Sequence, residues 1–228
     1  MLNAQDHSYQ ELTGQFLETF ERTWTTLLTD LNCEHSQLIL GSRLRPQIAL
    51  WGYLATVAEA DDIDYEMIAQ ASVSIELIHK ASLLIDDWID GDTARHGEDA
   101  FHITHGPQYA VVMAIYLVSE SMRRLKSVLP ANRIPPSHQY LCIDLIAETV
   151  HSMASGVLKE LRLSEAGIFD LETVKKIAHL ETAEILGNGM LLGYYIGGGT
   201  DDTVASMFKT IGDQCGYLFQ TSILQLLC

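Results

Sequence analysis

The sequence predicts an all-α protein, a single bundle of long antiparallel helices around a central apolar cavity. Apolar residues recur at spacings of three and four over most of the 228 residues. That is the period of an α-helix, whereas the alternation typical of a strand is hard to find. Only five prolines are present, and no low-complexity linker divides the chain. We therefore expect roughly eight helices joined by short loops, in one domain over residues 1–228.

The first half of the chain holds four long helical segments. The first has its apolar side chains at Phe16, Phe20, Trp24, Leu27 and Leu31, and the others cover residues 48–58, 68–89 and 109–129. Prolines mark helix starts or gaps at Pro46, Pro107, Pro130 and Pro135-Pro136. Residues 69–85 and 110–118 are apolar on more than one face, as in helices buried at the centre of a bundle. Such helices, packed side by side, leave an elongated slot.

The second half shows helix caps. Asp170 is a predicted N-cap, with Glu172 and Thr173 in the first turn of a helix that extends to Ala183. The glycines Gly197 to Gly199 close the next helix before Asp201 and Asp202 begin another. These caps predict that helices continue to the end of the sequence.

Composition excludes several classes of function. A net charge of -16 repels phosphate backbones and anionic lipids, which argues against binding to nucleic acid or a membrane surface. The four cysteines have no paired spacing, so neither a zinc site nor a disulfide framework is indicated. We find no signal peptide at the N-terminus, and no uncharged apolar stretch of the ~18 residues that a transmembrane helix needs. A cytoplasmic protein is the expectation.

Three acidic residues close the most apolar of these segments. In Asp86-Asp87-Trp88-Ile89-Asp90, a helix would place the carboxylates of Asp86, Asp87 and Asp90 on one face, about 5 to 6 Å apart. Ionising all three carboxylates at this end of the helix is unfavourable, because they repel one another and lie at the negative end of the helix dipole. A bound cation would offset this repulsion. Oxygen ligands so placed suit Mg²⁺ that bridges to phosphate. A solvated helix end would carry the same bare motif, so the flanking residues decide.

The flanking residues resemble those of trans-type prenyl diphosphate synthases, which include the farnesyl, geranylgeranyl and polyprenyl synthases. The run from Glu76 to Gly97 is similar to the family's first aspartate-rich region, with matches at Ile78-His79, Ala81-Ser82-Leu83, the three aspartates and Arg95-His96-Gly97. Upstream, Gly41-Ser42-Arg43-Leu44-Arg45-Pro46 resembles the block G-G-K-R-L-R-P, and Phe101-His102 with Gly106 follows downstream. The resemblance covers about Leu38 to Gln220 and implies the isoprenoid synthase fold.

The resemblance also implies a function in isoprenoid biosynthesis and roles for these residues. Asp86, Asp87 and Asp90 would hold Mg²⁺ against an allylic prenyl diphosphate, which is ionised before the prenyl group passes to an acceptor. Arg95 would contact the same diphosphate. The other candidates for diphosphate binding are Arg43, Arg45, His79 and His96, of which the last three would face the second substrate, usually isopentenyl diphosphate.

The sequence departs from the family pattern in several places. Ser42 and Glu181 stand where the family has lysines, and Val157 where it has a glutamine. The second aspartate-rich motif, here Phe219 to Cys228, has no carboxylate, although Glu160 or Glu181 could lend one. The sequence ends short of the family's usual length, and two explanations stay open: the chain is shortened at its C-terminus, or the protein has shed the C-terminal helices. Because positive charge is lost, a neutral or carbon-rich acceptor is easier to accommodate than isopentenyl diphosphate.

Two other functions stay open. A class I terpene cyclase on the same fold needs an apolar pocket but no second diphosphate, and its cations could be stabilised by aromatic rings, of which the candidates are Trp88, Tyr116, Tyr194, Tyr195 and Phe219. A non-catalytic subunit of an active synthase would explain the missing second motif but not three crowded carboxylates. We also expect a homodimer, with Tyr109 to Leu125 as the candidate interface.

Overall fold

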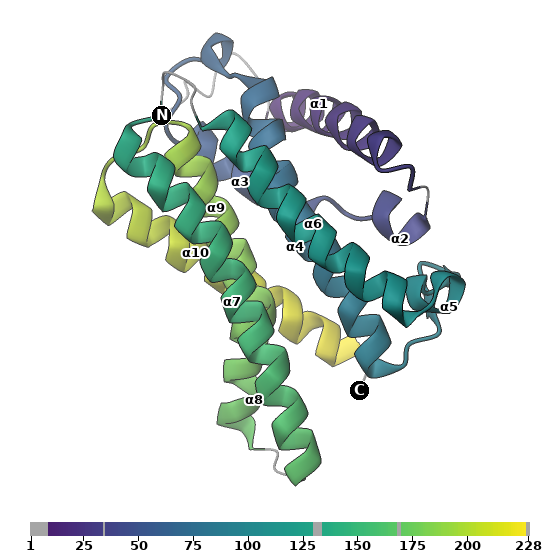
Figure 1. The fold of residues 1–228 in the computed structure, drawn as a ribbon. Helices are drawn as coiled ribbons and strands as arrows, with labels where there is room; N and C mark the ends of the chain where they lie inside the picture. Colours follow the sequence, from purple (N-terminus) through teal and green to yellow (C-terminus); the bar gives the residue numbers. More distant parts are fainter. Residues whose placement is uncertain (1–8, 34, 130–133, 168–169, 227–228) are drawn as a thin grey trace.

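The structure, a computed structural model, describes residues 9–33, 35–129, 134–167 and 170–226, with side chains as far as Leu218. The described chain is almost entirely helical, which confirms the all-α prediction (Figure 1). The helices of the first half are α1 (Tyr9–Asp30), α2 (Ser36–Ile39), α3 (Leu44–Leu54), a 3₁₀ turn (Ala60–Asp62), α4 (Tyr65–Asp90), α5 (Phe101–His105) and α6 (Pro107–Val128). Those of the second half are α7 (Pro136–Ala166), α8 (Leu171–Ala178), a π-helical turn (His179–Ala183), α9 (Glu184–Ile196) and α10 (Asp202–Leu226).

Several helix ends lie where the sequence placed them. Pro107 and Pro136 are the first residues of α6 and α7, because a proline lacks the N–H that the first turn leaves unbonded. The Asp170 carboxylate accepts a hydrogen bond from Thr173 N at 2.9 Å and caps α8. Gly197 to Gly199 follow α9, and Asp201 caps the start of α10 by accepting from Thr203 N at 2.8 Å. Pro130 lies outside the described residues.

Two local features were not predicted. A short antiparallel hairpin joins β1 (Ala94–Arg95) to β2 (Glu98–Asp99) directly after α4, and its turn contains His96 and Gly97, both with positive φ. The π-helical turn at His179–Ala183 runs without interruption from α8 into α9. Neither feature has a hydrophobic periodicity of its own, so pattern analysis could not detect it.

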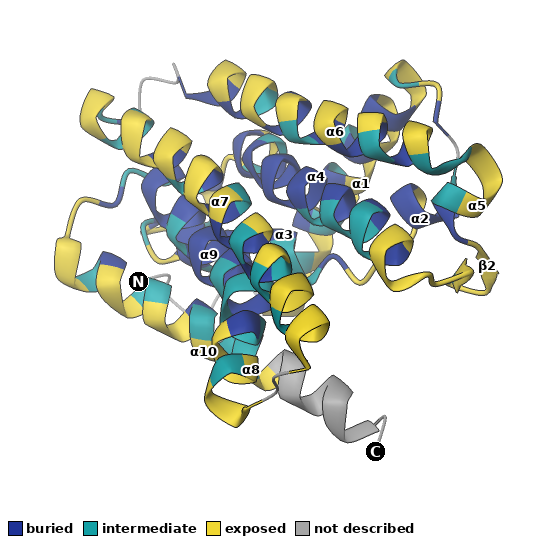
Figure 2. Cartoon of the chain, turned by 60° about the horizontal axis from the view of Figure 1, so that its bottom comes forward, coloured by how far each residue is buried: buried dark blue, intermediate teal, exposed yellow. Residues whose placement is uncertain are grey.

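Helix α4 forms the centre of the bundle. It packs most extensively on α6 and also contacts α1, α3 and α9, while α9 packs on α3 and α10. In Figure 2 the buried surface is concentrated on α4, α3 and α9, and α6, α7 and α10 turn exposed faces outward. Residues from Ala69 to Ile78 are almost all buried on every side of α4, as their apolar sequence predicts. The core therefore fixes the position of the C-terminal end of α4, where the aspartates lie.

Among the described residues, two helices are long and apolar enough, by length and composition, to cross a membrane: α4 and α7. The same test is passed by core helices of globular proteins. In α4, 72% of the apolar window is buried inside the fold, so its apolar character is accounted for by packing.

Glycines allow α3 and α9 to approach closely. A Cβ added at Gly193 would collide with the backbone of Ala49 and lie 3.0 Å from Tyr53 N, and one at Gly52 would collide with the backbone of Met190. Backbone atoms cannot move aside as a flexible side chain can. The contact of α3 with α9 thus depends on the absence of side chains at Gly52 and Gly193.

This close approach makes a prediction for stability. Gly193→Ala should lower the free energy of unfolding by at least about 3 kcal/mol, because the added methyl group forces two core helices apart. The control is Gly14→Ala in α1, where nothing lies within 4 Å of the added carbon, and which should gain about 0.5–1 kcal/mol. Urea unfolding of the three proteins measures both changes, and a Gly193→Ala variant as stable as wild type would contradict the packing.

Candidate active site

The C-terminal turn of α4 carries Asp86, Asp87 and Asp90. This long helix is held at both ends: Asp64 caps its start by accepting from Met67 N at 2.9 Å, and Gly91 ends it in the left-handed conformation, donating to Asp87 O. Its last turn contains no basic residue, so nothing on the helix itself offsets the negative charge there. Two of the aspartates, Asp86 and Asp90, face a cavity.

Two cavities meet at Asp86. The first, here called the apolar cavity, has a volume of about 550 Å³ and lies between α4, α6 and α7, lined mainly by aliphatic side chains. The second, the polar cavity, has a volume of about 560 Å³ and adjoins the Gly41-Ser42 turn, the β-hairpin and the π-helical turn. Five residues line both cavities: Ser82, Asp86, Ile89, Met153 and Val157. Asp86 is the only ionisable residue among these five, so its carboxyl group lies at the boundary between the apolar cavity and the polar cavity.

The pKa of Asp86 is raised to about 7, mainly because the carboxyl is desolvated and further because Asp90 and Asp87 repel its charge. The pKa of Asp90 is raised for the same kind of reason, with Asp92 as the main neighbouring charge. A carboxyl in such surroundings ionises readily only when a cation compensates it. The geometry thus agrees with the predicted preference of this helix end for cations.

Asp87 is arranged differently. It is 1% exposed, and its carboxylate accepts two hydrogen bonds from Arg95 Nε at 2.7 and 2.8 Å and one from Gln37 Nε2 at 2.5 Å. Gln37 also accepts from Phe101 N at 3.0 Å, so it ties the end of α4 to α5. In this structure Asp87 pairs with Arg95 instead of lining the cavity with Asp86 and Asp90, and no group of three or more His, Cys, Asp or Glu side chains among the described residues is placed to hold a metal ion.

The remaining predicted residues, with one exception, lie at the polar cavity. Arg45, His79, Arg95 and His96 line it. Arg43 does not: it is 6% exposed, and its guanidinium is bound by Glu21 and Glu76. Its predicted contact with a diphosphate therefore has no support in the structure. Sequence analysis pointed to neither Gln37 nor Lys80, although a lysine inside an apolar helix was a signal for the latter.

Burial and neighbouring cations keep the histidines of the polar cavity uncharged. The pKa of His79 is held well below its usual value by desolvation and then by Arg45, Lys80 and Arg95. That of His96 is also lowered, by desolvation first and then by Lys80 and Arg95. At neutral pH these imidazoles can exchange hydrogen bonds with a ligand but contribute little positive charge.

Glu160 and Glu181 supply further carboxyl groups to the polar cavity. Glu181 lies in the π-helical turn, and its pKa is raised to about 8 by desolvation, then by the charges of Glu160, Asp86 and Asp90. The Glu181 carboxyl is therefore mostly protonated at pH 7. Glu181 stands where the family has a lysine, but because its carboxyl is mostly protonated it adds little negative charge to the folded protein.

The aromatic residues considered for a cyclase lie away from the cavities. Trp88 is 44% and Tyr116 46% exposed. Tyr194 and Tyr195 pack against each other, with Phe208 and His138 as further neighbours. None of these four lines either cavity in the described part of the chain, and the side chain of Phe219 lies outside it.

Comparisons with known proteins agree with this architecture. The family model of polyprenyl synthetase matches residues 29–222. A geranylgeranyl diphosphate synthase of Methanosarcina mazei is 27% identical over 188 residues, which cover 79% of this chain and 52% of that protein. A nonaprenyl diphosphate synthase of Mycobacterium tuberculosis is 26% identical, with 79% and 49% covered. The chain thus spans about half the length of these curated relatives.

Solved structures show the same fold. The geranyltransferase of Helicobacter pylori superposes with a TM-score of 0.78 at 19% identity, covering 95% of this chain and 78% of that one. A structure of geranyltransferase from the same organism in complex with magnesium and isoprenyl diphosphate gives a TM-score of 0.76 at 20% identity, with 95% and 75% covered.

The raised pKa of Glu181 predicts how stability depends on pH. Since the folded protein holds this proton up to about pH 8 while the unfolded chain releases it near pH 4.5, ionisation costs stability as the pH rises between these values. Glu181→Gln removes the cost. At pH 8 the variant should be more stable than wild type by about 1–2 kcal/mol after allowing for solvent screening, and at pH 5 nearly equal to it.

Thermal unfolding at both pH values measures the effect. Glu165→Gln, which replaces an exposed glutamate on α7, is the matched control and should show no such difference. A Glu181→Gln variant whose advantage is the same at pH 5 and pH 8 would contradict the assigned protonation.

Proposed function

The chain belongs to the polyprenyl synthetase family, and on that premise we propose that it is a Mg²⁺-dependent prenyltransferase that ionises an allylic prenyl diphosphate. One observation carries the proposal: Asp86 lies where the apolar and polar cavities meet. A prenyl diphosphate has the same division, a hydrocarbon chain joined to a charged head. Its chain fits the apolar cavity and its head the polar one, so the bond to be broken lies at the boundary.

The side chains at this boundary fit a divalent cation in their chemistry. Asp86 and Asp90 offer hard oxygen ligands, and Glu160 and Glu181 line the same polar cavity. The pKa values of Asp86, Asp90 and Glu181 are raised first by desolvation and then by repulsion from neighbouring carboxylates, and a bound cation would remove the repulsion. When bound there, Mg²⁺ would neutralise the charge that develops on the leaving diphosphate.

The protein's own groups account for the rest of the reaction. The C–O bond to the diphosphate breaks, the diphosphate leaves with the electron pair, a new bond joins the prenyl carbon to the acceptor, and the acceptor loses a proton. Arg95, oriented by its pair with Asp87, is the proposed contact to the leaving diphosphate. Aliphatic residues of α4, α6 and α7 keep water from the carbocation. Trp88, Tyr116, Tyr194 and Tyr195 line neither cavity, which favours transfer over cyclisation.

We also propose that the protein acts as a homodimer joined through α6. Away from the apolar cavity, this helix exposes large apolar side chains: Tyr109 at 53%, Val112 at 64%, Tyr116 at 46% and Met122 at 42%. A contiguous apolar face of this kind is a typical protein interface, and a second copy offers a self-complementary partner.

Replacing Asp86 tests the assigned reaction. Asp86→Asn should reduce Mg²⁺-dependent release of diphosphate from geranyl, farnesyl or geranylgeranyl diphosphate by at least about 10²-fold, because the group at the boundary can no longer bind the cation. Release of diphosphate and analysis of the organic product, with and without isopentenyl diphosphate, measure the effect. Asp61→Asn at an exposed position far from the cavities is the control, and equal activity of both variants would refute the proposal.

The proposed dimer is tested at Val112, which lines neither cavity. Val112→Asp should convert a dimer to a monomer in analytical ultracentrifugation, since it buries a carboxylate in an apolar interface. Met207→Asp places the same charge on the exposed face of α10 and should leave the dimer intact. A wild-type protein that sediments as a monomer would contradict the proposal directly.

A further inference from the structure

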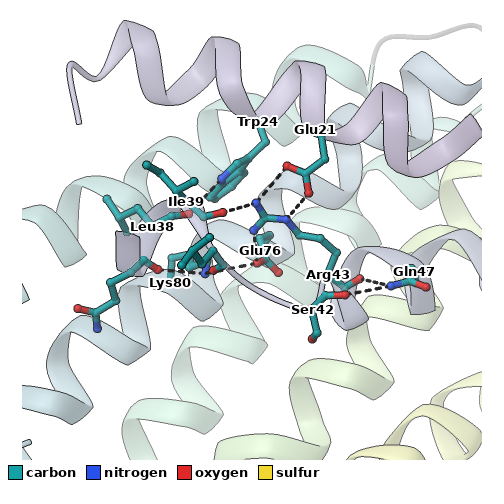
Figure 3. Close-up of polar contacts among 11 residues, drawn as sticks. Glu21, Trp24, Leu38, Ile39, Ser42, Arg43, Gln47, Glu76 and Lys80 are labelled. Atoms are coloured by element: carbon teal, nitrogen blue, oxygen red, sulfur yellow. Dashed lines mark hydrogen bonds and ion pairs between the residues drawn. The ribbon is translucent and has the colours of Figure 1, made fainter. Parts of the chain in front are cut away.

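Helix α2 is a single turn that is anchored through its backbone carbonyl groups. Four consecutive carbonyl groups, in the helix and its C-cap, accept hydrogen bonds from side chains outside the helix. These bonds are Lys80 Nζ to Gln37 O at 3.0 Å, Trp24 Nε1 to Leu38 O at 3.1 Å, Arg43 Nη2 to Ile39 O at 2.6 Å, and Lys80 Nζ to Leu40 O (Figure 3). Because the last carbonyl groups of a helix have no partner within it, the side chains of other segments determine where α2 lies.

The anchored helix presents one buried amide, that of Gln37, to the C-terminal end of α4. This residue is 1% exposed. Its Nε2 atom donates to Asp87 Oδ2 at 2.5 Å and to Leu83 O at 3.2 Å, and its Oε1 atom accepts from Phe101 N at 3.0 Å. The three bonds use both N–H groups and the oxygen of the amide, so the side chain is held in one orientation.

The bond from Gln37 fixes the carboxylate of Asp87, which in turn binds Arg95. Rotation of an aspartate carboxylate about its Cβ–Cγ bond has no sharp intrinsic preference, so its hydrogen bonds set its orientation. Gln37 bonds one oxygen, Oδ2, while Arg95 Nε donates to Oδ1 at 2.7 Å and to Oδ2 at 2.8 Å. Because the guanidinium is a planar, rigid group of donors, the carboxylate that Gln37 holds also sets the orientation of Arg95.

The segment that carries Arg95 gives this side chain little restraint of its own. Its hairpin pairs only two residues of β1 with two of β2, and apart from the partly buried Arg95 its strands and turn are exposed. A two-stranded hairpin of this kind is at best marginally stable by itself. The orientation of Arg95 therefore depends on its pair with Asp87. Arg95 lines the polar cavity, whereas Gln37, in the described structure, lines neither cavity.

We propose that Gln37 is a positioning residue: by fixing the Asp87 carboxylate, it holds Arg95 in the orientation that binds the leaving diphosphate. This rests on the proposed function, in which Arg95 contacts that diphosphate. An arginine already ordered by the protein binds an anion without the entropic cost of ordering a free side chain. Loss of the Gln37 amide therefore weakens diphosphate binding, although this residue does not touch the ligand.

Gln37→Met tests the proposal, because methionine is close to glutamine in length and shape but has no N–H group for Asp87. Calorimetric titration of the full chain with inorganic pyrophosphate in the presence of Mg²⁺ should show an affinity about 10-fold lower than that of wild type. Gln70→Met makes the same change nearer the start of α4, where the amide donates to Glu66, and should bind as wild type does. Wild-type affinity in Gln37→Met overturns the proposal.

A double-mutant cycle separates positioning from a general loss of structure. Arg95→Gln keeps an N–H donor for Asp87 but removes the charge, and should itself weaken pyrophosphate binding at least about 10-fold. If Gln37 acts through Arg95, adding Gln37→Met to Arg95→Gln should lower the affinity by less than about 2-fold further. Effects of the two substitutions that multiply in the double variant contradict this route and overturn the proposal.

A measurement without ligand or metal distinguishes this proposal from the proposed function. In ¹⁵N-labelled protein, the Nε–H group of Arg95 should exchange with solvent at least about 10-fold faster in Gln37→Met than in wild type. The Nε–H group of Arg43, which is bound to Glu21, should keep its rate. Unchanged exchange at Arg95, or an equal increase at Arg43, overturns the proposal. If wild type cleaves no allylic diphosphate but binding and exchange change as expected, the proposed reaction fails and the positioning role of Gln37 stands.

Discussion

The arrangement of the whole site depends on one electrostatic constraint: carboxyl groups are crowded at the end of a helix whose body is buried in the core. Helix α4 cannot shift without disrupting its packing on α6, α1 and α3, so Asp86 is held at the junction of the two cavities. There it is desolvated and repelled by its neighbours, which raises its pKa to about 7. The fold thus maintains an electrostatic cost that a bound cation would remove.

How much positive charge each basic side chain of the site offers to a ligand depends more on its ion-pair partners than on its residue type. Arg43, Arg45, Lys80 and Arg95 all lie near the polar cavity, yet three of them pair with carboxylates within the protein: Arg43 with Glu21 and Glu76, Lys80 with Glu76, and Arg95 with Asp87. Arg45 has no such ion pair among the described residues, and its buried Nε atom has no hydrogen-bond partner there. Counting basic residues in the sequence therefore misjudges which of them can bind an anion.

The sequence was sufficient for the features that arise from local patterns. Helical periodicity, the Asp170 cap and the proline starts of α6 and α7 are all local, and the structure confirms them. The placement of Asp86 and Asp90 at a cavity follows from their position at the end of a core helix. In contrast, the pairing of Asp87 with Gln37, 50 positions earlier, and the contact of Lys80 with Gln37 O depend on how α2 docks on α4. No spacing rule within one segment encodes such contacts, and the same reason explains why Arg43 was placed in the site.

The departures from the family pattern also have a different meaning in three dimensions. Read along the chain, Ser42 and Glu181 remove two positive charges and add a negative one. In the folded protein Lys80 brings an ammonium to within contact of Gly41, next to Ser42, and the raised pKa of Glu181 keeps its carboxyl mostly neutral at pH 7. The polar cavity is therefore lined by both basic and acidic side chains, as anionic substrates and a divalent cation together require.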